Sequence, residues 1–280
     1  MNPSKKKELK IMATKVRIGI VESVHSAKAG HPGGSLSIAD VLTYLYFDKM
    51  NIDPKNPKKA DRDRLVLSKG HAAPALYSVL ANRGFLPVED LLTLRHTGSY
   101  LQGHPDMKHI PGVDMSSGSL GQGISAAVGM ALSSKHYNDG YRVYTILGDG
   151  ECEEGQVWEA AMFAVNKKLS NLTAFVDFNG LQIDGSIEEV NSPAPLDKKF
   201  EAFGWNVIVI DAHDFDQIEE ATLAAEKVTD KPTAIIMKSV KGKGVSFMEN
   251  NCGWHGKAPN DEQCEIALKE LKTELASLEA

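Results

Sequence analysis

The chain has 280 residues, with 31 Lys and Arg against 37 Asp and Glu, so its formal net charge at pH 7 is −6. This acidic balance argues against a nucleic-acid partner, because binding to phosphates requires a surplus of clustered Lys and Arg. No stretch approaches the roughly 18 apolar residues of a membrane span, so the sequence predicts no membrane partner. The three cysteines lack the spacing of a disulfide framework or a zinc site, which predicts free thiols in a cytoplasmic protein.

The first half of the chain is predicted to alternate helices with glycine-rich turns. Residues 5–29 should form a helix, because apolar residues recur every three or four positions along one face: Leu9, Met12, Val16, Ile20 and Val24. The glycines and proline of "AGHPGGSLS" end that helix, and "SIADVLTYLYF" resumes the helical pattern. Further on, "DRLVLSKGHAAPALYSVLANRG" reads as a strand, a turn and a helix, and "SSGSLGQGISAAVGMALSSKHY" as a loop that leads into a helix.

From about residue 142 the pattern alternates strictly between strands and helices. The expected strands are "YRVYTIL", "LTAFVDF", "NVIVI" and "TAIIMKSV". The expected helices lie at about 154–168, in "PLDKKFEAFG", at about 215–228 and, closing the chain, at about 261–280. Apolar strands separated by helices indicate an α/β fold, a mostly parallel sheet flanked by helices. We expect residues 1–280 to form a single domain.

Asp149 and Asn179 each follow an apolar strand directly and are 179 − 149 = 30 residues apart. A strand-helix-strand unit of about 30 residues brings equivalent strand ends to one edge of the sheet, where α/β proteins bind ligands. A carboxylate, an amide oxygen and a loop carbonyl are hard ligands suited to magnesium, which also takes oxygens from a bound diphosphate. The alternative is that Asp149 caps a helix and Asn179 begins a turn with Gly180. The sequence contains no other standard phosphate-binding motif.

The run "GDG", followed at this distance by "NGLQIDG", resembles the signature of thiamine diphosphate enzymes. The resemblance implies that thiamine diphosphate is the cofactor and that its magnesium, or calcium or manganese in its place, is bound by Asp149, Asn179 and the Leu181 carbonyl. It also implies that Gly148 and Gly150 allow the diphosphate to approach the backbone. The cofactor would supply the carbanion chemistry, and the protein would orient it and exclude water.

Four histidines lie in glycine or proline contexts: His31 in "GHPGG", His71 in "SKGHAA", His104 in "QGHPD" and His255 in "GWHGKAP". A lone loop histidine is usually structural, but imidazoles suit a site that binds sugar hydroxyls and moves protons near neutral pH. All four contexts resemble those of transketolase, and the likeness extends over nearly the whole chain. It implies that His31 and His104 contact the sugar donor, and that His71 and His255 lie near the diphosphate and the reacting carbon.

The same resemblance implies roles for residues outside these histidines. Gly118 and Leu120 in "GSLGQG" would border the aminopyrimidine ring of the cofactor. Glu154 and Glu159 in "GDGECEEGQVWEA" would belong to an acidic network that links two active sites, with Glu154 close to the cofactor.

Transketolases also need a pyrimidine-binding domain, which carries the glutamate that activates the cofactor, and no motif of that domain is recognisable here. The resemblance is therefore to the amino-terminal, diphosphate-binding subunit of a split transketolase. The implied partner is a carboxy-terminal subunit in a heterotetramer of two plus two, and the implied reaction moves a two-carbon ketol unit from a ketose phosphate to an aldose phosphate. Three alternatives remain: the alpha subunit of a 2-oxoacid dehydrogenase, deoxyxylulose phosphate synthase, and a non-catalytic subunit that only holds the cofactor.

Overall fold

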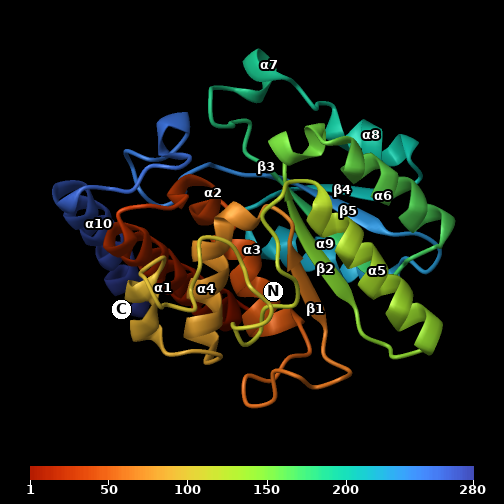
Figure 1. Cartoon of the computed structure of the whole chain (residues 1–280), viewed down its shortest axis with the longest axis horizontal. Coiled ribbons are helices and arrows are strands. Elements are labelled where there is room, and N and C mark those ends of the chain that lie inside the picture. The colour runs from red at the N-terminus through yellow and green to blue at the C-terminus, as the bar shows by residue number, and fades with distance from the viewer.

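The computed structural model describes all 280 residues, and its centre is one five-stranded sheet in which every neighbouring pair of strands is parallel (Figure 1). The strands are β1 (Arg64–Leu67), β2 (Val143–Gly148), β3 (Leu172–Phe178), β4 (Asn206–Asp211) and β5 (Thr233–Lys238). Their spatial order is β1-β2-β3-β5-β4. The predicted α/β fold with a parallel sheet is confirmed.

Helices pack on both faces of the sheet (Figure 1). One face is covered by α1 (Pro3–Ala27), α2 (Pro32–Leu36), α3 (Ala39–Tyr44), α4 (Ala73–Arg83), α9 (Phe215–Lys227) and α10 (Asp261–Glu279). The other face is covered by α5 (Gln122–Tyr137), α6 (Gly155–Asn166) and α8 (Leu196–Ala202), and the short α7 (Ile187–Val190) lies in the loop after β3. No helix combines the length and the apolar character needed to cross a membrane.

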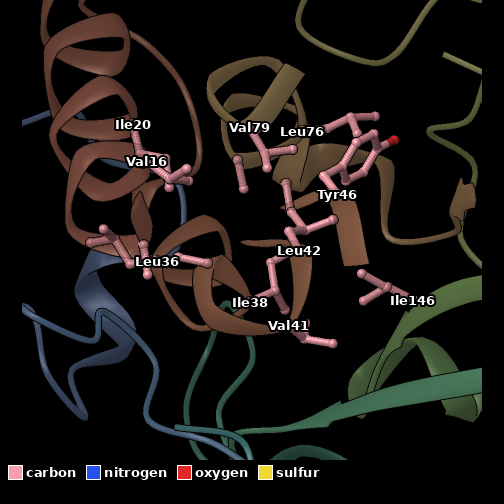
Figure 2. Close-up of a cluster of buried hydrophobic side chains, with 14 of the residues drawn as sticks. Val16, Ile20, Leu36, Ile38, Val41, Leu42, Tyr46, Leu76, Val79 and Ile146 are labelled. Atoms are coloured by element: carbon pink, nitrogen blue, oxygen red, sulfur yellow. The ribbon is translucent and has the colours of Figure 1, made fainter. Parts of the chain in front are cut away.

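The alternation of side chains along each strand divides the core into two apolar clusters. On β2, Tyr144 and Ile146 join the cluster beneath α1, α3 and α4, whereas Val143 and Leu147 join the cluster beneath α5 and α6. Figure 2 shows part of the first cluster, where side chains of α1, α3 and α4 meet the sheet at Ile146. The inner strands β2, β3 and β5 are buried along nearly their whole length, as the apolar runs in the sequence indicated. The edge strand β4 is only partly buried, and its Val209 is 46% exposed.

The ends of the helices follow local capping chemistry. The first helix begins at Pro3, two residues before the predicted start, because the Asn2 side chain accepts a hydrogen bond from the Ser4 amide at 2.9 Å. It ends at Ala27, where Lys28 adopts the left-handed conformation with φ of 50°. The closing helix begins at Asp261 as predicted, with Asn260 as its cap.

A buried ion pair joins α1 to α3. The Arg17 guanidinium donates two hydrogen bonds to the Asp40 carboxylate and a third to the Lys243 carbonyl at 3.1 Å. His213 contacts the same carboxylate through Nδ1 at 2.7 Å, while its Nε2 accepts from the Val240 amide. Burial alone would raise the pKa of Asp40, but Arg17 and His213 outweigh burial and lower the pKa to about 2.

We expect Asp40→Ala to lower the free energy of unfolding by about 3–5 kcal/mol, because it leaves the charge of Arg17 buried without its partner. Urea unfolding followed by circular dichroism measures this loss. Lys198→Ala is the control, because it removes an ion pair with Glu201 at the surface. The side chain of Lys198 is 66% exposed and that of Glu201 is 47% exposed. The control should lower the free energy of unfolding by less than about 1 kcal/mol. Equal decreases in the free energy of unfolding in the two variants would contradict this prediction.

Candidate active site

A cavity of about 270 Å³ opens at the carboxyl edge of the sheet, where strand ends and loops meet. Predicted site residues that line it are His31, His71, Gly118, Leu120, Gly148, Asp149, Gly150, Asn179, Leu181 and His255. They come from sequence segments far apart in the chain, from the turn before α2 to the turn after Trp254. The structure thus brings most of the predicted site into one place.

Asp149 and Asn179 stand side by side at this edge, as their 30-residue spacing predicted. Gly148 of β2 pairs with Asp177 of β3. Asp149 and Asn179, which follow these paired residues, therefore lie at the same end of the two strands. The Asp149 carboxylate accepts hydrogen bonds from the amides of Gly150 at 2.8 Å and Gly180 at 2.6 Å. Burial and the neighbouring Asp177 raise the pKa of Asp149 to about 6, because both disfavour its negative charge. A cation bound beside Asp149 would offset this effect and stabilise the ionised carboxylate.

Two further oxygen atoms belong to residues that line the same cavity, Asn179 and Leu181. The side-chain Oδ1 of Asn179 accepts a hydrogen bond from the Leu181 amide at 3.1 Å. The Leu181 carbonyl accepts from the Lys241 ammonium at 2.8 Å, so a positive charge already lies against one of the predicted metal ligands. A carboxylate, an amide oxygen and a main-chain carbonyl together form the hard-oxygen set expected for magnesium.

Three of the four predicted histidines form a triangle of imidazole rings. The ring centroids of His31 and His71 are 5.2 Å apart, those of His31 and His255 5.5 Å, and those of His71 and His255 5.2 Å. Burial lowers the pKa of His31 to about 4, of His71 to about 2 and of His255 to about 3. All three rings are therefore neutral at pH 7, and each has one N–H donor and one acceptor nitrogen.

Sequence reasoning missed two buried lysines that line the cavity, Lys69 and Lys241. Lys69 donates to the Gly34 carbonyl at 2.7 Å and forms an ion pair with Asp177. Lys241 also contacts Nδ1 of His255 at 2.9 Å, and burial together with the charge of Lys69 lowers its pKa to about 8. Both follow a strand within a few residues, in "SKGHAA" and "KSVKGKG", and this position after a strand is the signal that could have identified them.

Glu151, another missed residue, holds three segments of the cavity wall together. Its carboxylate accepts from the Ser68 hydroxyl at 2.5 Å and from the amides of Gly121 and Gly148, each at 2.9 Å. The ends of β1 and β2 are thereby tied to the glycine-rich loop that precedes α5.

His104, Glu154 and Glu159 do not line the cavity, so their predicted roles stay predictions. His104 lies next to it: a Cβ atom on Gly118, whose φ is 154°, would be 3.1 Å from the His104 ring. Glu154 is exposed at the start of α6, and Glu159 borders a surface groove beside α5 and α6.

The parallel sheet flanked by helices, with its cavity at the carboxyl edge, has the architecture of the thiamine diphosphate-binding fold. The chain belongs to the transketolase family: residues 8–276 match the family described as "Transketolase, thiamine diphosphate binding domain".

Relatives and solved structures agree with this assignment. The chain is 48% identical to the 6-deoxy-6-sulfo-D-fructose transketolase subunit SqwG of Clostridium sp. (strain MSTE9), over 95% of this chain and 97% of the relative. It is 42% identical to an apulose-4-phosphate transketolase subunit of Phocaeicola vulgatus, over 97% and 96% of the two chains. The crystal structure of transketolase from Campylobacter jejuni superposes with a TM-score of 0.90 at 32% identity, covering 99% of this chain and 46% of that chain.

Proposed function

We propose that residues 1–280 form the diphosphate-binding domain and subunit of a split transketolase that binds thiamine diphosphate and a divalent cation and transfers a two-carbon ketol unit. The observation that carries this proposal is the convergence of Asp149, Asn179 and the Leu181 carbonyl with three neutral imidazoles in one cavity. A helix cap and a turn would account for Asp149 and Asn179 alone, but they give no reason for the imidazoles to meet there.

The residues at the cavity fit the cofactor in charge and in hydrogen bonding. Asp149 has a raised pKa, so a cation beside it would stabilise its ionised form. Lys69 and Lys241 supply positive charge for a diphosphate. The Nδ1 atom of His31 is buried without a hydrogen-bond partner, although His31 lines the cavity and could meet a ligand there.

Each group has a distinct task in this proposal. Asp149, Asn179 and the Leu181 carbonyl would hold magnesium, or calcium or manganese in its place, as the anchor for the diphosphate. Thiamine diphosphate, when bound, supplies the carbanion chemistry of ketol transfer. His71 and His255 line the same cavity and would lie near the diphosphate and the reacting carbon, where neutral rings would donate hydrogen bonds without adding charge.

We infer that a second polypeptide, a carboxy-terminal transketolase subunit with the pyrimidine-binding domain, completes the site, in a heterotetramer of two plus two. Two relatives that match along nearly their whole length are themselves named subunits, and the chain spans 46% of the Campylobacter transketolase. Leu120 and Ile183 both line the cavity and are 37% and 66% exposed. Apolar side chains at a cavity rim are suited to cover by a partner domain.

The proposed donor is a ketose with a terminal anion, and the acceptor is an aldose phosphate. The names of the two relatives contain a sulfonated ketose and a ketose phosphate, both of which end in a strong anion. The test is to combine the chain with its partner, magnesium and thiamine diphosphate, and to assay ketose phosphate, 6-deoxy-6-sulfo-D-fructose and a 2-oxoacid as donors. Ketol transfer from one of the sugars is the expected result. Decarboxylation of the 2-oxoacid without ketol transfer would favour the dehydrogenase alternative.

We expect His31→Ala and His104→Ala to reduce ketol transfer far more than cofactor affinity, because both residues are proposed to contact the sugar. Removing a hydrogen-bond donor to developing charge costs about 2.7–4 kcal/mol, or 10²–10³ in kcat. Steady-state kinetics of the assembled enzyme, with cofactor affinity from calorimetry, separates the two effects. His136→Ala, an exposed histidine at the far end of α5, is the control and should behave as wild type. Wild-type turnover in both test variants would leave these histidines a structural role.

A further inference from the structure

Asp177 is a fully buried carboxylate directly behind the proposed cation site. It is 0% exposed near the end of β3. Its Oδ2 accepts from the Lys69 ammonium, from the Ser37 hydroxyl at 2.6 Å and from the Asn179 side-chain amide at 3.0 Å, and its Oδ1 accepts from Ser239. One carboxylate thus joins the segments that follow β1, β3 and β5.

Every contact of the Asp177 carboxylate comes from a donor group: the Lys69 ammonium, with which it forms an ion pair, the hydroxyls of Ser37 and Ser239, and the side-chain amide of Asn179. An ionised carboxylate has only acceptor atoms. The side chain of Asn179 must therefore turn its NH2 group, and not its oxygen, toward Asp177.

This contact determines which atom of Asn179 is available to the cavity. With Nδ2 directed at Asp177, Oδ1 lies on the other side, where it accepts from the Leu181 amide at 3.1 Å. A reversed amide would present an NH2 group to a cation, and that group has no lone pair to offer. The orientation of the Asn179 oxygen therefore depends on a buried ion pair, Lys69–Asp177, that lies outside the proposed set of cation ligands.

We propose that Asp177 is a positioning residue for the cation site: together with Lys69 it fixes the side chain of Asn179 so that its oxygen faces the cavity. This inference rests on the proposed function, because Asn179 is a proposed cation ligand. Residues that orient metal ligands through hydrogen bonds typically change metal affinity by about 10–100-fold when they are replaced. Because the Leu181 amide still contacts Asn179, we expect an effect at the lower end of that range.

The test replaces the ion pair as a unit, Lys69→Met with Asp177→Leu, so that no single charge is left buried. Mn²⁺ is titrated into the assembled two-subunit enzyme with saturating thiamine diphosphate, and free Mn²⁺ is followed by electron paramagnetic resonance. The double variant should bind Mn²⁺ about tenfold more weakly than wild type. Ser239→Ala is the matched control, because it removes a hydrogen bond to Asp177 but leaves the contact with Asn179, and it should bind Mn²⁺ as wild type does.

A third substitution distinguishes positioning from general support of the fold. Adding Asn179→Asp to the double variant gives a side chain that presents oxygen in either orientation, so Mn²⁺ affinity should recover most of its loss. A purely structural role for Lys69 and Asp177, or a loss caused by weaker diphosphate binding, predicts no recovery. If the double variant does not fold, Asp177→Glu keeps the charge but moves the carboxylate by one methylene group, and should show the same loss and the same recovery.

The outcomes separate this inference from the proposed function. Wild-type Mn²⁺ affinity in the double variant, or no recovery in the triple variant, would overturn the positioning role and leave the cation site in place. Failure of the wild-type enzyme to bind Mn²⁺ with thiamine diphosphate would overturn the proposed cation site, and the positioning role with it.

Discussion

Asp149→Ala and Asn179→Ala are each expected to abolish magnesium-dependent binding of thiamine diphosphate while leaving the fold intact. Each substitution removes one proposed hard oxygen ligand from the edge of the sheet, and magnesium tolerates little departure from its preferred coordination. Neither side chain belongs to the two apolar clusters that stabilise the fold. Calorimetry with the assembled enzyme, with and without magnesium, measures the effect.

The matched control for this pair is Asp139→Ala. It removes the same type of charge at an exposed position after α5, near the amino ends of the strands. This variant should bind the cofactor as wild type does, and all variants should show wild-type circular dichroism spectra. Near-normal cofactor affinity in Asp149→Ala or Asn179→Ala would mean that the metal site lies elsewhere.

The second large effect concerns the partner: the purified chain alone should show no ketol transfer, and the carboxy-terminal subunit should restore it. Every recognised motif belongs to the diphosphate-binding half of the enzyme, and the cofactor must also be held and activated through its aminopyrimidine ring. The measurement follows product from a ketose phosphate and an aldose phosphate, with and without the partner. Size-exclusion chromatography with light scattering of the mixture checks the proposed two-plus-two assembly.

Robust turnover by the lone chain would contradict this proposal. It would mean that an activating carboxylate lies within these 280 residues. Glu154 and Glu159 are the first to examine in that case, because both are exposed outside the cavity and accessible to a second copy of the chain. Replacing each by Gln would show which of them supports the activity.

The elements that position the site could be predicted because local patterns agree with the tertiary structure. The apolar strands "YRVYTIL" and "LTAFVDF" are buried on both faces, and the 30-residue spacing of Asp149 and Asn179 follows from one strand-helix-strand unit. The loop histidines were identifiable through their glycine and proline contexts. The rings of His31, His71 and His255 meet at the cavity, in agreement with their predicted positions in loops between helices and strands.

The buried charges could not be predicted in the same way, because their meaning depends on contacts between distant segments. Lys69 and Asp177 are 108 positions apart, and neither stands out in a sequence where lysine and aspartate are usually exposed. Asp177 lies within the apolar strand β3, and a carboxylate in such a strand indicates burial. The strand pattern alone does not show which partner stabilises its charge. The position of His104 outside the cavity lining likewise depends on how its loop packs against Gly118, which no local pattern encodes.

The most direct test of the account is a crystal structure of the chain with its partner, thiamine diphosphate and Mn²⁺, with anomalous scattering used to locate the metal. We predict one Mn²⁺ peak per chain within about 2.0–2.3 Å of oxygens of Asp149, Asn179 and the Leu181 carbonyl, with the diphosphate beside Lys241 and His71. A metal bound elsewhere, or a diphosphate outside this cavity, would contradict the central claim that the carboxyl edge of β2 and β3 is the cofactor site.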